Sequence, residues 1–415
     1  MAANARPFGE LFAVATRNGL TRPKAVRGAG VKMVNMGELF AHPRLRNASM
    51  DRVSLSEAEA DKFLLEPGDL LFARQSLVLE GAGKCSIFLE DDELVTFESH
   101  ITRVRLDPQK ADPRFYFYYL QYHHGRAAIK SIVEQGAGAS GIRGSDLGKL
   151  RVLWRPVSEQ RAIADSLGAL DDKIEQNRRT ELALEQLAQA IFRAWFVDFE
   201  PVKAKAAGAT TFPSMPEPVF DALPTRFVDS EIGPVPEGWQ VLRLDESLTL
   251  QRGFDLPKQS RTDGSHPVFA ASGLNGWHSE WKVRGPGVTT GRSGVLGQVY
   301  FVDRDFWPLN TSLWVKKYKR SNPWHAFFLL QTLDLAQFNA GSAVPTLNRN
   351  HVHSLPIVTP PDALLKAFGQ TCESTFSLDQ QLRKEADTLA ATRDYLLPKL
   401  LSGDVAPGVF SREVE

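Results

Sequence analysis

Two stretches of this sequence repeat each other. Residues 136–156 read GAGASGIRGSDLGKLRVLWRP, and residues 341–361 read GSAVPTLNRNHVHSLPIVTPP. At a shift of 205 residues, from 136 to 341, the apolar positions stay in step, and Ile142 meets Leu347. We interpret the two stretches as parts of two diverged copies of one structural unit.

The copies extend upstream in the same order. Three further pairs of segments resemble each other: GKCSIFL from residue 83 and GQVYFV from residue 297, ESHITRV from residue 98 and NTSLWVK from residue 310, and the aromatic stretches 115–122 and 324–330. Apolar patterning indicates strands within the copies, mixed with short helices, at residues 85–89, 94–106 and 299–302. Each copy is therefore predicted to be a β-rich domain, and the expected fold class is α+β.

A long helix is predicted after each copy. In the first helix Ser158 is a suitable N-cap, and apolar residues then recur at the spacing of a coiled-coil seam, at Ile163, Leu167, Leu170 and Ile174. Asn177 continues the seam, where a buried asparagine fixes register rather than adding stability. The second helix has seam residues seven apart, at Phe368, Thr375, Leu382, Leu389 and Leu396. Each helix would be about 60 Å long at about 1.5 Å per residue.

Six regions follow from this organisation. Seven prolines between the copies indicate a linker, because proline cannot continue a helix: Pro201, Pro213, Pro216, Pro218, Pro224, Pro234 and Pro236. The expected regions are a first domain (1–156), a central helix (157–200), a Pro-rich linker (201–234), a second domain (235–361), a distal helix (362–402) and a tail (403–415).

Composition narrows the class of protein without identifying it. A chain of 415 residues with 43% hydrophobic and 24% charged residues is typical of a water-soluble protein with roughly two to four domains. The 49 basic residues balance 49 acidic ones, so any nucleic-acid partner must be met by local patches. Two distant cysteines encode neither a zinc cluster nor a disulfide framework, and no apolar run approaches the roughly 18 residues of a membrane span. We expect a reducing cytoplasm.

Two motifs suggest chemistry but lack its context. GAGASG at residues 136–141 has dinucleotide-binding spacing, yet it follows an aromatic, helical segment instead of a strand, and the second copy loses it. Asp263, Glu280 and Lys282 have the carboxylate–carboxylate–lysine arrangement of magnesium nucleases. The first copy has no counterpart of this triplet, and solvated residues on alternate strand positions explain it as well.

Other catalytic and metal signals are weaker still. His351 and His353 have no nearby acid or cysteine, so a polar edge or a DNA contact explains them better than a metal. Asn322, Pro323 and Trp324 lack the second proline of a base-methylating motif. We therefore expect no catalytic residue and no metal site.

Local charge gives a positive argument. Residues 1–50 contain eight basic residues against Glu10 and Glu38, namely Arg6, Arg17, Arg22, Lys24, Arg27, Lys32, Arg44 and Arg46. In the second copy Lys316, Lys317, Lys319 and Arg320 cluster, and TTGRSGVLGQ places Arg292 on a glycine-rich loop. A guanidinium fork suits phosphate or the O6/N7 edge of guanine, although a basic run is also typical of a solvated surface.

The sequence resembles the DNA-specificity subunits of type I restriction–modification systems. The resemblance covers nearly the whole chain and is carried by EQRAIADSLGALDDKIEQNRRTELALEQLAQAIFRAWFVDFEPVKAK from residue 159, GPVPEGWQVLRL from 233, GRSGVLGQVYFVDRDFWPLNTS from 291 and LLPKLLSG from 396. The first copy lacks a PEGW opening, and the second helix begins PPDALLKAF instead of with the EQ start.

The resemblance implies two target-recognition domains with pseudo-twofold symmetry, each reading half of a split DNA site, separated by two long antiparallel helices. These helices would dock methyltransferase subunits, two in number, in a complex that also holds restriction subunits. Half-sites about 34 Å apart per helical turn fit helices of this length. The chain would have no cofactor of its own, because S-adenosylmethionine, ATP and magnesium would belong to the partners.

Arg74 and Arg292 are the leading candidate DNA contacts, because both precede the matched GKCSIFL and GQVYFV strands. Further candidates at equivalent strand or loop positions are Lys84, Arg143, Asn348 and Arg349. Two alternatives stay open: a repeat scaffold that binds protein or saccharide, and a metal-dependent nuclease built on the Asp263 triplet.

Overall fold

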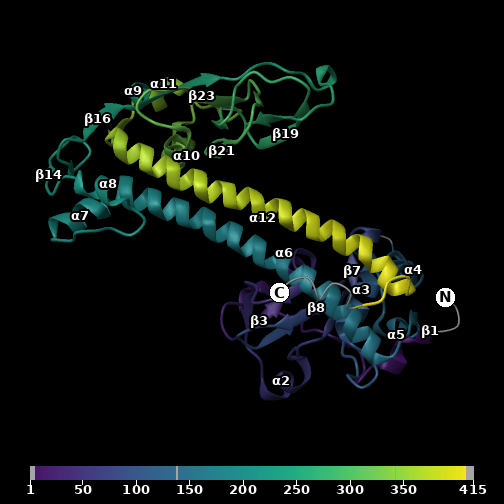
Figure 1. Cartoon of the computed structure of the whole chain (residues 1–415). Coiled ribbons are helices and arrows are strands. Elements are labelled where there is room, and N and C mark those ends of the chain that lie inside the picture. The colour runs from purple at the N-terminus through teal and green to yellow at the C-terminus, as the bar shows by residue number, and fades with distance from the viewer. Residues whose placement is uncertain (1–4, 137–138, 342, 408–415) are drawn as a thin grey trace. The chain divides into compact units, whose positions relative to one another are not determined.

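The chain forms two compact units that divide both long helices between them. The computed structural model describes residues 5–136, 139–341 and 343–407. Unit 1 comprises residues 1–177 and 384–415, and unit 2 comprises residues 178–383. The long helices are α6 (Val157–Phe192) and α12 (Asp362–Ser402), so each unit contains one part of α6 and one part of α12 (Figure 1). This division differs from the six regions expected from the sequence, in which each helix stands alone.

Unit 1 is built on a five-stranded sheet. Its strand order is β2 (Arg17–Asn18), β10 (Ile101–Val104), β6 (Leu70–Ala73), β8 (Cys85–Glu90) and β4 (Arg44–Arg46). A second sheet has the order β5 (Asp51–Val53), β3 (Val31–Val34) and β9 (Val95–Phe97), with β3 and β9 parallel. The first strand, β1 (Ala5–Pro7), pairs with the strand before α6, β13 (Arg151–Leu153).

Unit 2 repeats this topology. Its larger sheet has the order β17 (Leu248–Arg252), β23 (Ser312–Tyr318), β20 (Gly287–Gly291) and β21 (Val299–Val302). The smaller sheet has the order β19 (Gly273–His278), β18 (His266–Ala270) and β22 (Trp307–Pro308), with β18 and β22 parallel. Again an early strand, β16 (Gln240–Arg243), pairs with the strand before the long helix, β24 (Pro356–Thr359). The internal repeat of the sequence is thus a repeat of strand order.

The aromatic stretches form equivalent helices, α3 (Pro113–Gln121) and α10 (Pro323–Thr332). Each helix begins with a proline in its first turn, where a missing backbone N–H costs nothing. The residue before the proline caps the helix, because its side chain accepts a backbone N–H. Asp112 accepts from Arg114 at 2.8 Å, and Asn322 accepts from His325 at 2.9 Å.

Shorter elements complete the two units. In unit 1 they are α1 (Met36–Ala41), α2 (Glu57–Phe63), α4 (His123–Lys130), α5 (Gly144–Leu147), β7 (Gln75–Ser76), β11 (Glu134–Gln135) and β12 (Ser140–Gly141). In unit 2 they are α7 (Glu200–Ala206), α8 (Glu217–Asp221), α9 (Leu244–Ser247), α11 (Arg349–His353), β14 (Phe227–Val228) and β15 (Val235–Pro236). None of the described helices has the length and apolar composition needed to cross a membrane.

Several segments differ in detail from their sequence-based expectation. Residues 94–106 form two strands, β9 and β10, with a turn between them. Residues 201–234 contain α7, α8 and β14, and buried side chains such as Phe220 pack them into the core of unit 2. The glycine motif at 136–141 lies in the β11–β12 hairpin, where the Gly136 N–H donates to the Ala139 carbonyl; residues 137–138 lie outside the described part of the chain.

An aromatic cluster joins the two helix segments of unit 2. Phe368 of α12 is fully buried, and its ring centroid lies 5.8 Å from that of Phe192 on α6 and 6.1 Å from that of Trp195. α10 closes the cluster with Phe328, 5.9 Å from Phe368. Large aromatic side chains bury much apolar area, so this cluster packs the helix pair firmly against α10 of unit 2.

Replacing Phe368 with alanine should lower the stability of unit 2 by about 3–5 kcal/mol, because it leaves a cavity in the aromatic cluster. Urea unfolding followed by tryptophan fluorescence measures this, since seven of the eight tryptophans lie in residues 178–383. Leu378→Ala is the control, because Leu378 is 42% exposed on the same helix. Equal effects of the two changes would contradict a packed seam at Phe368.

Burial of His325 should make unit 2 sensitive to acid. The side chain of this α10 residue is buried against Phe192 and Phe196, and burial lowers its pKa to about 3. The unfolded chain takes up a proton near pH 6.5 while the folded unit does not, so stability is lost as pH falls from about 6.5 toward 3. The free energy of unfolding should drop by about 2 kcal/mol between pH 7 and pH 5. His325→Leu should flatten this dependence in urea titrations; an unchanged slope would refute the assignment to His325.

Candidate nucleic-acid interface and helix seam

Arg74 and Arg292 occupy the same structural position in the two units. Arg74 directly follows β6, and Arg292 directly follows β20. Each of these strands is third in the strand order of the larger sheet of its unit. The Arg74 N–H donates to the His100 carbonyl at 2.8 Å, and the Arg292 N–H donates to the Thr311 carbonyl at 2.8 Å. The structural counterpart of Thr311 is therefore His100. The matched heptapeptides ESHITRV and NTSLWVK align Thr311 with Ser99 instead, one residue earlier.

A second segment is held against each arginine by the same backbone contact. The Arg74 carbonyl accepts the Ile142 N–H at 2.9 Å, and the Arg292 carbonyl accepts the Leu347 N–H at 2.8 Å. Ile142 and Leu347 are the pair that the sequence repeat aligns. We call these two sets of residues, 74–78 with 140–143 and 292–296 with 345–349, the arginine loops.

The guanidinium groups of both loops are partly fixed. Nη1 of Arg74 lies 3.5 Å from the Ser99 carbonyl oxygen, and Nε of Arg292 donates to the Asn310 carbonyl at 2.9 Å. Partial burial, with the nearby charge of Arg252, lowers the pKa of Arg292. An incompletely solvated guanidinium fork is pre-organised to bind an acceptor such as a phosphate or a base edge.

The other candidate residues lie in different surroundings. Arg143 and Asn348 are the N-cap residues of α5 and α11, and both are exposed. Arg143 pairs with Glu134 at 2.8 Å, whereas the Asn348 side chain accepts the Asn350 N–H. Arg349 is also exposed. These three residues adjoin the arginines through the Ile142 and Leu347 contacts.

Lys84 is engaged inside unit 1. Its ammonium group donates to the Phe40 carbonyl at 3.1 Å and lies 4.9 Å from the centroid of the Phe40 ring. The backbone of Lys84 accepts the Ala73 N–H, next to Arg74. The structure thus gives Lys84 an intramolecular contact beside the arginine loop.

One shared feature of the arginine loops was missed in the sequence. The third residue after each arginine is an exposed aliphatic side chain, Leu77 at 89% and Val295 at 42% exposure. The matched loops contained the signal, because Leu77 and Val295 follow Arg74 and Arg292 at equal spacing.

The basic N-terminal run is largely neutralised within unit 1. Five of its eight basic residues form ion pairs with acids elsewhere: Arg22 with Glu59, Arg27 with Asp51, Lys32 with Asp91, Arg44 with Asp172, and Arg46 with Glu90. The charge count of residues 1–50 therefore overstates the positive surface available to a partner.

The alternative chemistries gain no geometric support. No cluster of three His, Cys, Asp or Glu side chains suited to a metal occurs among the described residues, which include Asp263, Glu280 and both histidines of α11. Nζ of Lys282 lies 4.8 Å from the Trp307 ring centroid. His353 is structural, since its Nε2 accepts the buried Leu250 N–H at 2.9 Å.

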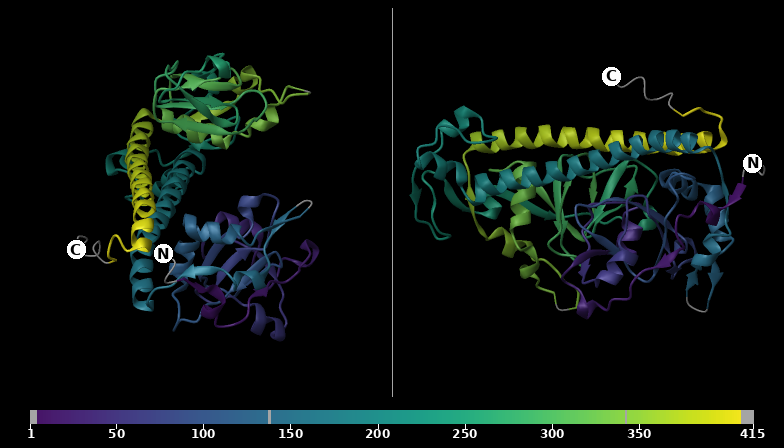
Figure 2. Two further views of the ribbon diagram at one scale, coloured as in Figure 1. Left: turned by 90° about the vertical axis from the view of Figure 1, so that its right-hand side faces the viewer. Right: turned by 90° about the horizontal axis from the view of Figure 1, so that it is seen from below.

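The predicted seam of the first helix is buried along unit 1. Ile163, Leu167 and Ile174 are at most 4% exposed, and Leu170 is half-buried. The first two pack in one core with residues of the second half of α12, Leu396, Leu397, Leu400 and Leu401. The two helices are therefore antiparallel within this unit, and ribbon views show them side by side (Figure 2).

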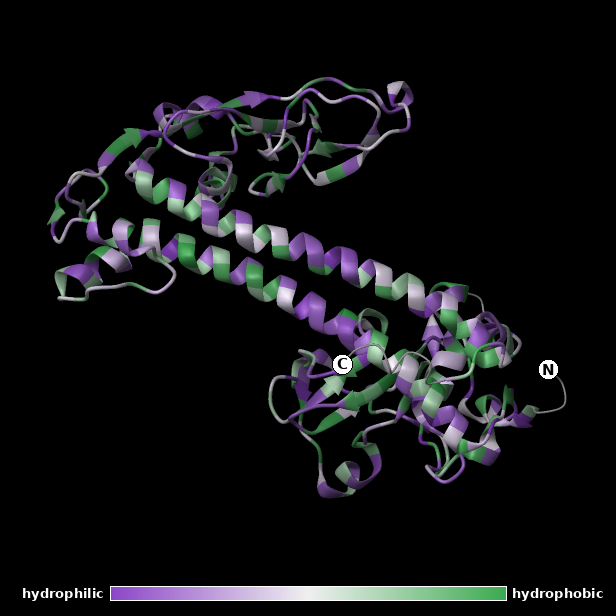
Figure 3. Cartoon of the chain, viewed as in Figure 1, coloured by the Kyte–Doolittle hydropathy of each residue, from purple (hydrophilic) through white to green (hydrophobic). Residues whose placement is uncertain are grey.

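Polar residues interrupt the seam near the middle of each helix. Asn177 is 1% exposed, and its Nδ2 donates to Glu385 of α12 at 2.9 Å. In unit 2, Phe368 is buried, whereas Leu382 is half-buried, as is Leu389 in unit 1. The hydropathy colouring shows hydrophilic residues around the middle of both helices (Figure 3). A buried Asn–Glu contact of this kind specifies the register of the helix pair.

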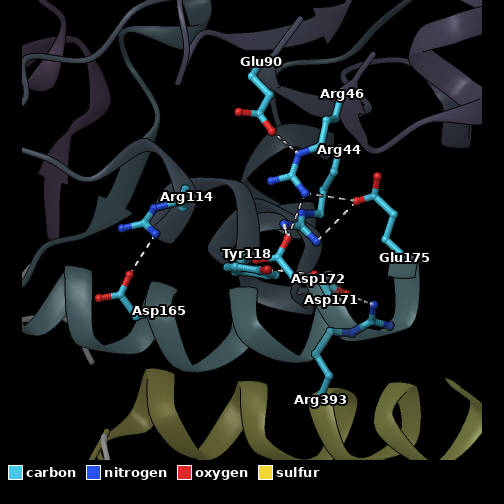
Figure 4. A network of polar contacts seen from close by, with 10 residues as sticks. All are labelled: Arg44, Arg46, Glu90, Arg114, Tyr118, Asp165, Asp171, Asp172, Glu175 and Arg393. Atoms are coloured by element: carbon cyan, nitrogen blue, oxygen red, sulfur yellow. Dashed lines mark hydrogen bonds and ion pairs between the residues drawn. The ribbon is translucent and has the colours of Figure 1, made fainter. Parts of the chain in front are cut away.

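Asp171 of α6 joins three elements of unit 1 (Figure 4). Its carboxylate accepts the Tyr118 hydroxyl of α3 at 2.7 Å and Nη1 of Arg393 on α12 at 2.7 Å. Burial, then the Asp171 charge and hydrogen bond, raises the pKa of Tyr118, so the phenol remains a donor. Burial opposes the charge of Arg393, but Asp171 raises the pKa of this arginine overall.

Outer ion pairs extend this network toward the sheet. Asp172 lies 2.5 Å from Arg44 and 3.3 Å from Arg46, both on β4, and Asp165 pairs with Arg114 of α3 at 2.8 Å. These acids are more than half exposed, so each pair contributes little alone. Together they surround a hollow of about 220 Å³ between β4, α3 and α6.

Comparison with known proteins finds similarity to one class. The family model described as the type I restriction modification DNA specificity domain matches residues 8–186. The HindI specificity subunit of Haemophilus influenzae is 23% identical over 90% of this chain and 94% of its own length. The MjaIX specificity subunit of Methanocaldococcus jannaschii is 25% identical over 70% of this chain and 68% of its own.

A solved structure shares the fold. The type I restriction-modification S subunit from M. genitalium has a TM-score of 0.63 at 17% identity, with 95% of each chain covered. Residues 8–186 therefore match the type I restriction modification DNA specificity domain, and over most of its length the chain is similar to type I specificity subunits.

Removing the Asp171 carboxylate should destabilise unit 1 strongly. Asp171→Ala leaves the buried Tyr118 hydroxyl without its acceptor and leaves Arg393 with only the exposed Asp394, at a cost of about 3–5 kcal/mol. Asp165→Ala removes an exposed pair and should cost less than about 1 kcal/mol. Hydrogen exchange of α3 and β6 in increasing urea compares the two. The network would lose its assigned role if Asp171→Ala were no more damaging than Asp165→Ala.

Proposed function

We propose that this chain supplies DNA sequence specificity to a type I restriction–modification complex. Unit 1 reads one half of a bipartite site and unit 2 reads the other. The observation that carries the proposal is the pair of arginine loops, in which equivalent backbone contacts hold Arg74 and Arg292 in one geometry. A duplicated reader with diverged side chains suits a site whose halves differ in sequence.

The chemistry of the loops suits base edges. A guanidinium fork donates two hydrogen bonds to O6 and N7 of guanine, and an aliphatic side chain contacts the methyl group of thymine. Each loop offers both, as Arg74 with Leu77 and Arg292 with Val295. Arg143, Asn348 and Arg349 lie beside them at the start of α5 or α11 and complete the proposed contact set, to which Lys84 contributes its backbone position.

The long helices are the proposed docking elements for two modification subunits. Two exposed leucines of α6, Leu182 at 61% and Leu187 at 48%, leave apolar surface outside the seam. Such surface on a helix favours a protein partner. The complex would also contain restriction subunits and would act in the cytoplasm.

Catalysis is assigned to the partners. The relatives are specificity subunits by name, and adenine methylation, translocation and cleavage require S-adenosylmethionine, ATP and magnesium, which the partner subunits would bind. This chain would select where those reactions occur.

Each arginine should control only one half of the methylated motif. Arg292→Ala should weaken binding of the specific duplex by about 1–3 kcal/mol, or roughly 5- to 150-fold, and relax the half-site read by unit 2. Arg74→Ala should do the same for the other half. Single-molecule sequencing of methylated bases, with the assembled complex expressed in a host, reports both halves at once.

Two controls sharpen this test. Arg226→Ala removes an exposed arginine that pairs with Glu237 in unit 2 and should leave both halves unchanged. Arg292→Lys keeps the charge but loses the fork, so it should not restore the motif if the arginine reads a base. Methylation at an unaltered bipartite motif in both alanine variants would argue against the arginine loops as readers. Methylation with no bipartite motif in the unmodified complex would argue against the function itself.

A further inference from the structure

A basic hollow lies on unit 2 beside the arginine loop. It has a volume of about 380 Å³ and is lined by β17, the end of β23 and α11. Its charged lining residues are Lys316, Lys317, Lys319 and Arg349, and no carboxylate lines it. Leu347, two residues before α11, donates its N–H to the Arg292 carbonyl, so the start of α11 follows closely on the arginine loop.

A β-bulge places two consecutive lysines in this hollow. Thr249 of β17 pairs with Lys317 of β23, but the next residue, Leu250, pairs with Val315, so Lys316 is the extra residue. Successive side chains of a regular strand point to opposite faces, whereas a bulge re-aims one of them. Lys316 and Lys317 are accordingly both exposed, and both line the hollow.

Two of the charges of the hollow, those of Lys316 and Lys317, are not paired with an acid among the described residues. Neither Lys316 nor Lys317 has a carboxylate within 4 Å in the described part of the chain. Lys319 donates to the backbone carbonyl of Asp245 at 2.6 Å, while the Asp245 carboxylate pairs with Arg243 at 3.0 Å. Several like charges around one hollow repel each other, and a bound anion would offset that repulsion.

The described residues at the corresponding positions of unit 1 differ in charge. The strand that corresponds to β23 is β10, which pairs with β2 at Thr102 and Arg103. Arg105, at the position of Lys316, is bound by Asp69 at 2.7 Å and by Glu66. At the start of α5, Gly144 and Ser145 stand where α11 has Arg349 and Asn350. The described residues at these positions of unit 1 therefore do not gather unpaired basic charge as those of unit 2 do.

We propose that this hollow binds a phosphate group of the DNA backbone next to the half-site that unit 2 reads. The inference rests on the proposed function and adds to it an anchor that carries no sequence information. Lysine ammonium groups are compact point charges, which suit phosphate oxygens, and phosphate contacts fix register without reading bases. Unit 2 would thus hold the duplex more by charge than unit 1 does.

The salt dependence of binding tests the proposal. Affinity of the complex, assembled from the full chain and its modification subunits, is measured for a duplex carrying its motif at several salt concentrations. Lys316→Gln combined with Lys317→Gln should make the slope of log affinity against log salt shallower by roughly 0.9, because each phosphate that the protein neutralises contributes roughly 0.9. The methylated motif should stay the same in both halves.

A matched double variant is the control. Lys203→Gln with Arg226→Gln removes two exposed basic residues of unit 2 that lie outside both long helices and do not line the hollow, and it should leave the slope unchanged. A slope unaltered by the Lys316 and Lys317 changes overturns the phosphate site, although a bipartite motif would still support the proposed function. A relaxed half-site in that variant also overturns it, because the lysines would then read bases. Equal affinity of the unmodified complex for all duplexes contradicts the proposed function instead.

Discussion

The buried carboxylate of Asp171 is the interaction on which the arrangement of unit 1 depends. A buried charge is costly unless it is paired, so the two donors that satisfy it, Tyr118 and Arg393, cannot move away from α6. The sheet of the domain, through α3, and the second long helix are thereby fixed to one position along the first. Asn177 and Glu385 repeat the same principle two turns further on. In unit 2, aromatic packing around Phe368 fixes the two helix segments to the domain. This packing is strong but less directional than an ion pair.

Backbone contacts explain how the two copies keep one geometry while their sequences diverge. The hydrogen bonds that hold the arginine loops join N–H and carbonyl groups, which every residue except proline provides. Side chains on these loops can therefore change without loss of the loop. Arg74 and Arg292 are the same residue in both copies, whereas Gln75 and Ser293, which follow them, differ. A recognition surface built in this way can acquire a new preference through substitution alone.

The sequence predicted the features that depend on periodicity and order. The repeat gave the equivalence of Arg74 and Arg292, and heptad spacing gave the buried positions of α6, including Asn177. It did not predict contacts between residues far apart in the chain, such as Asp171 with Arg393 or Lys84 with Phe40, because nothing local marks the partner. The same limit explains residues 201–234, where the prolines indicate a linker but Phe220 packs in a core that other segments form.

Ion pairs between distant residues are the clearest example of contacts that the sequence does not predict. They also determine which basic residues can still bind a ligand. A count along the sequence favours residues 1–50 as the most basic surface, yet five of those residues are paired with acids elsewhere in unit 1. Lys316 and Lys317 belong to a shorter run, but a bulge directs both into one hollow that no carboxylate lines. Since a paired charge has little potential left for a ligand, the shorter run is the stronger positive feature. The balanced charge of the whole chain therefore conceals two units that present their basic residues in different ways.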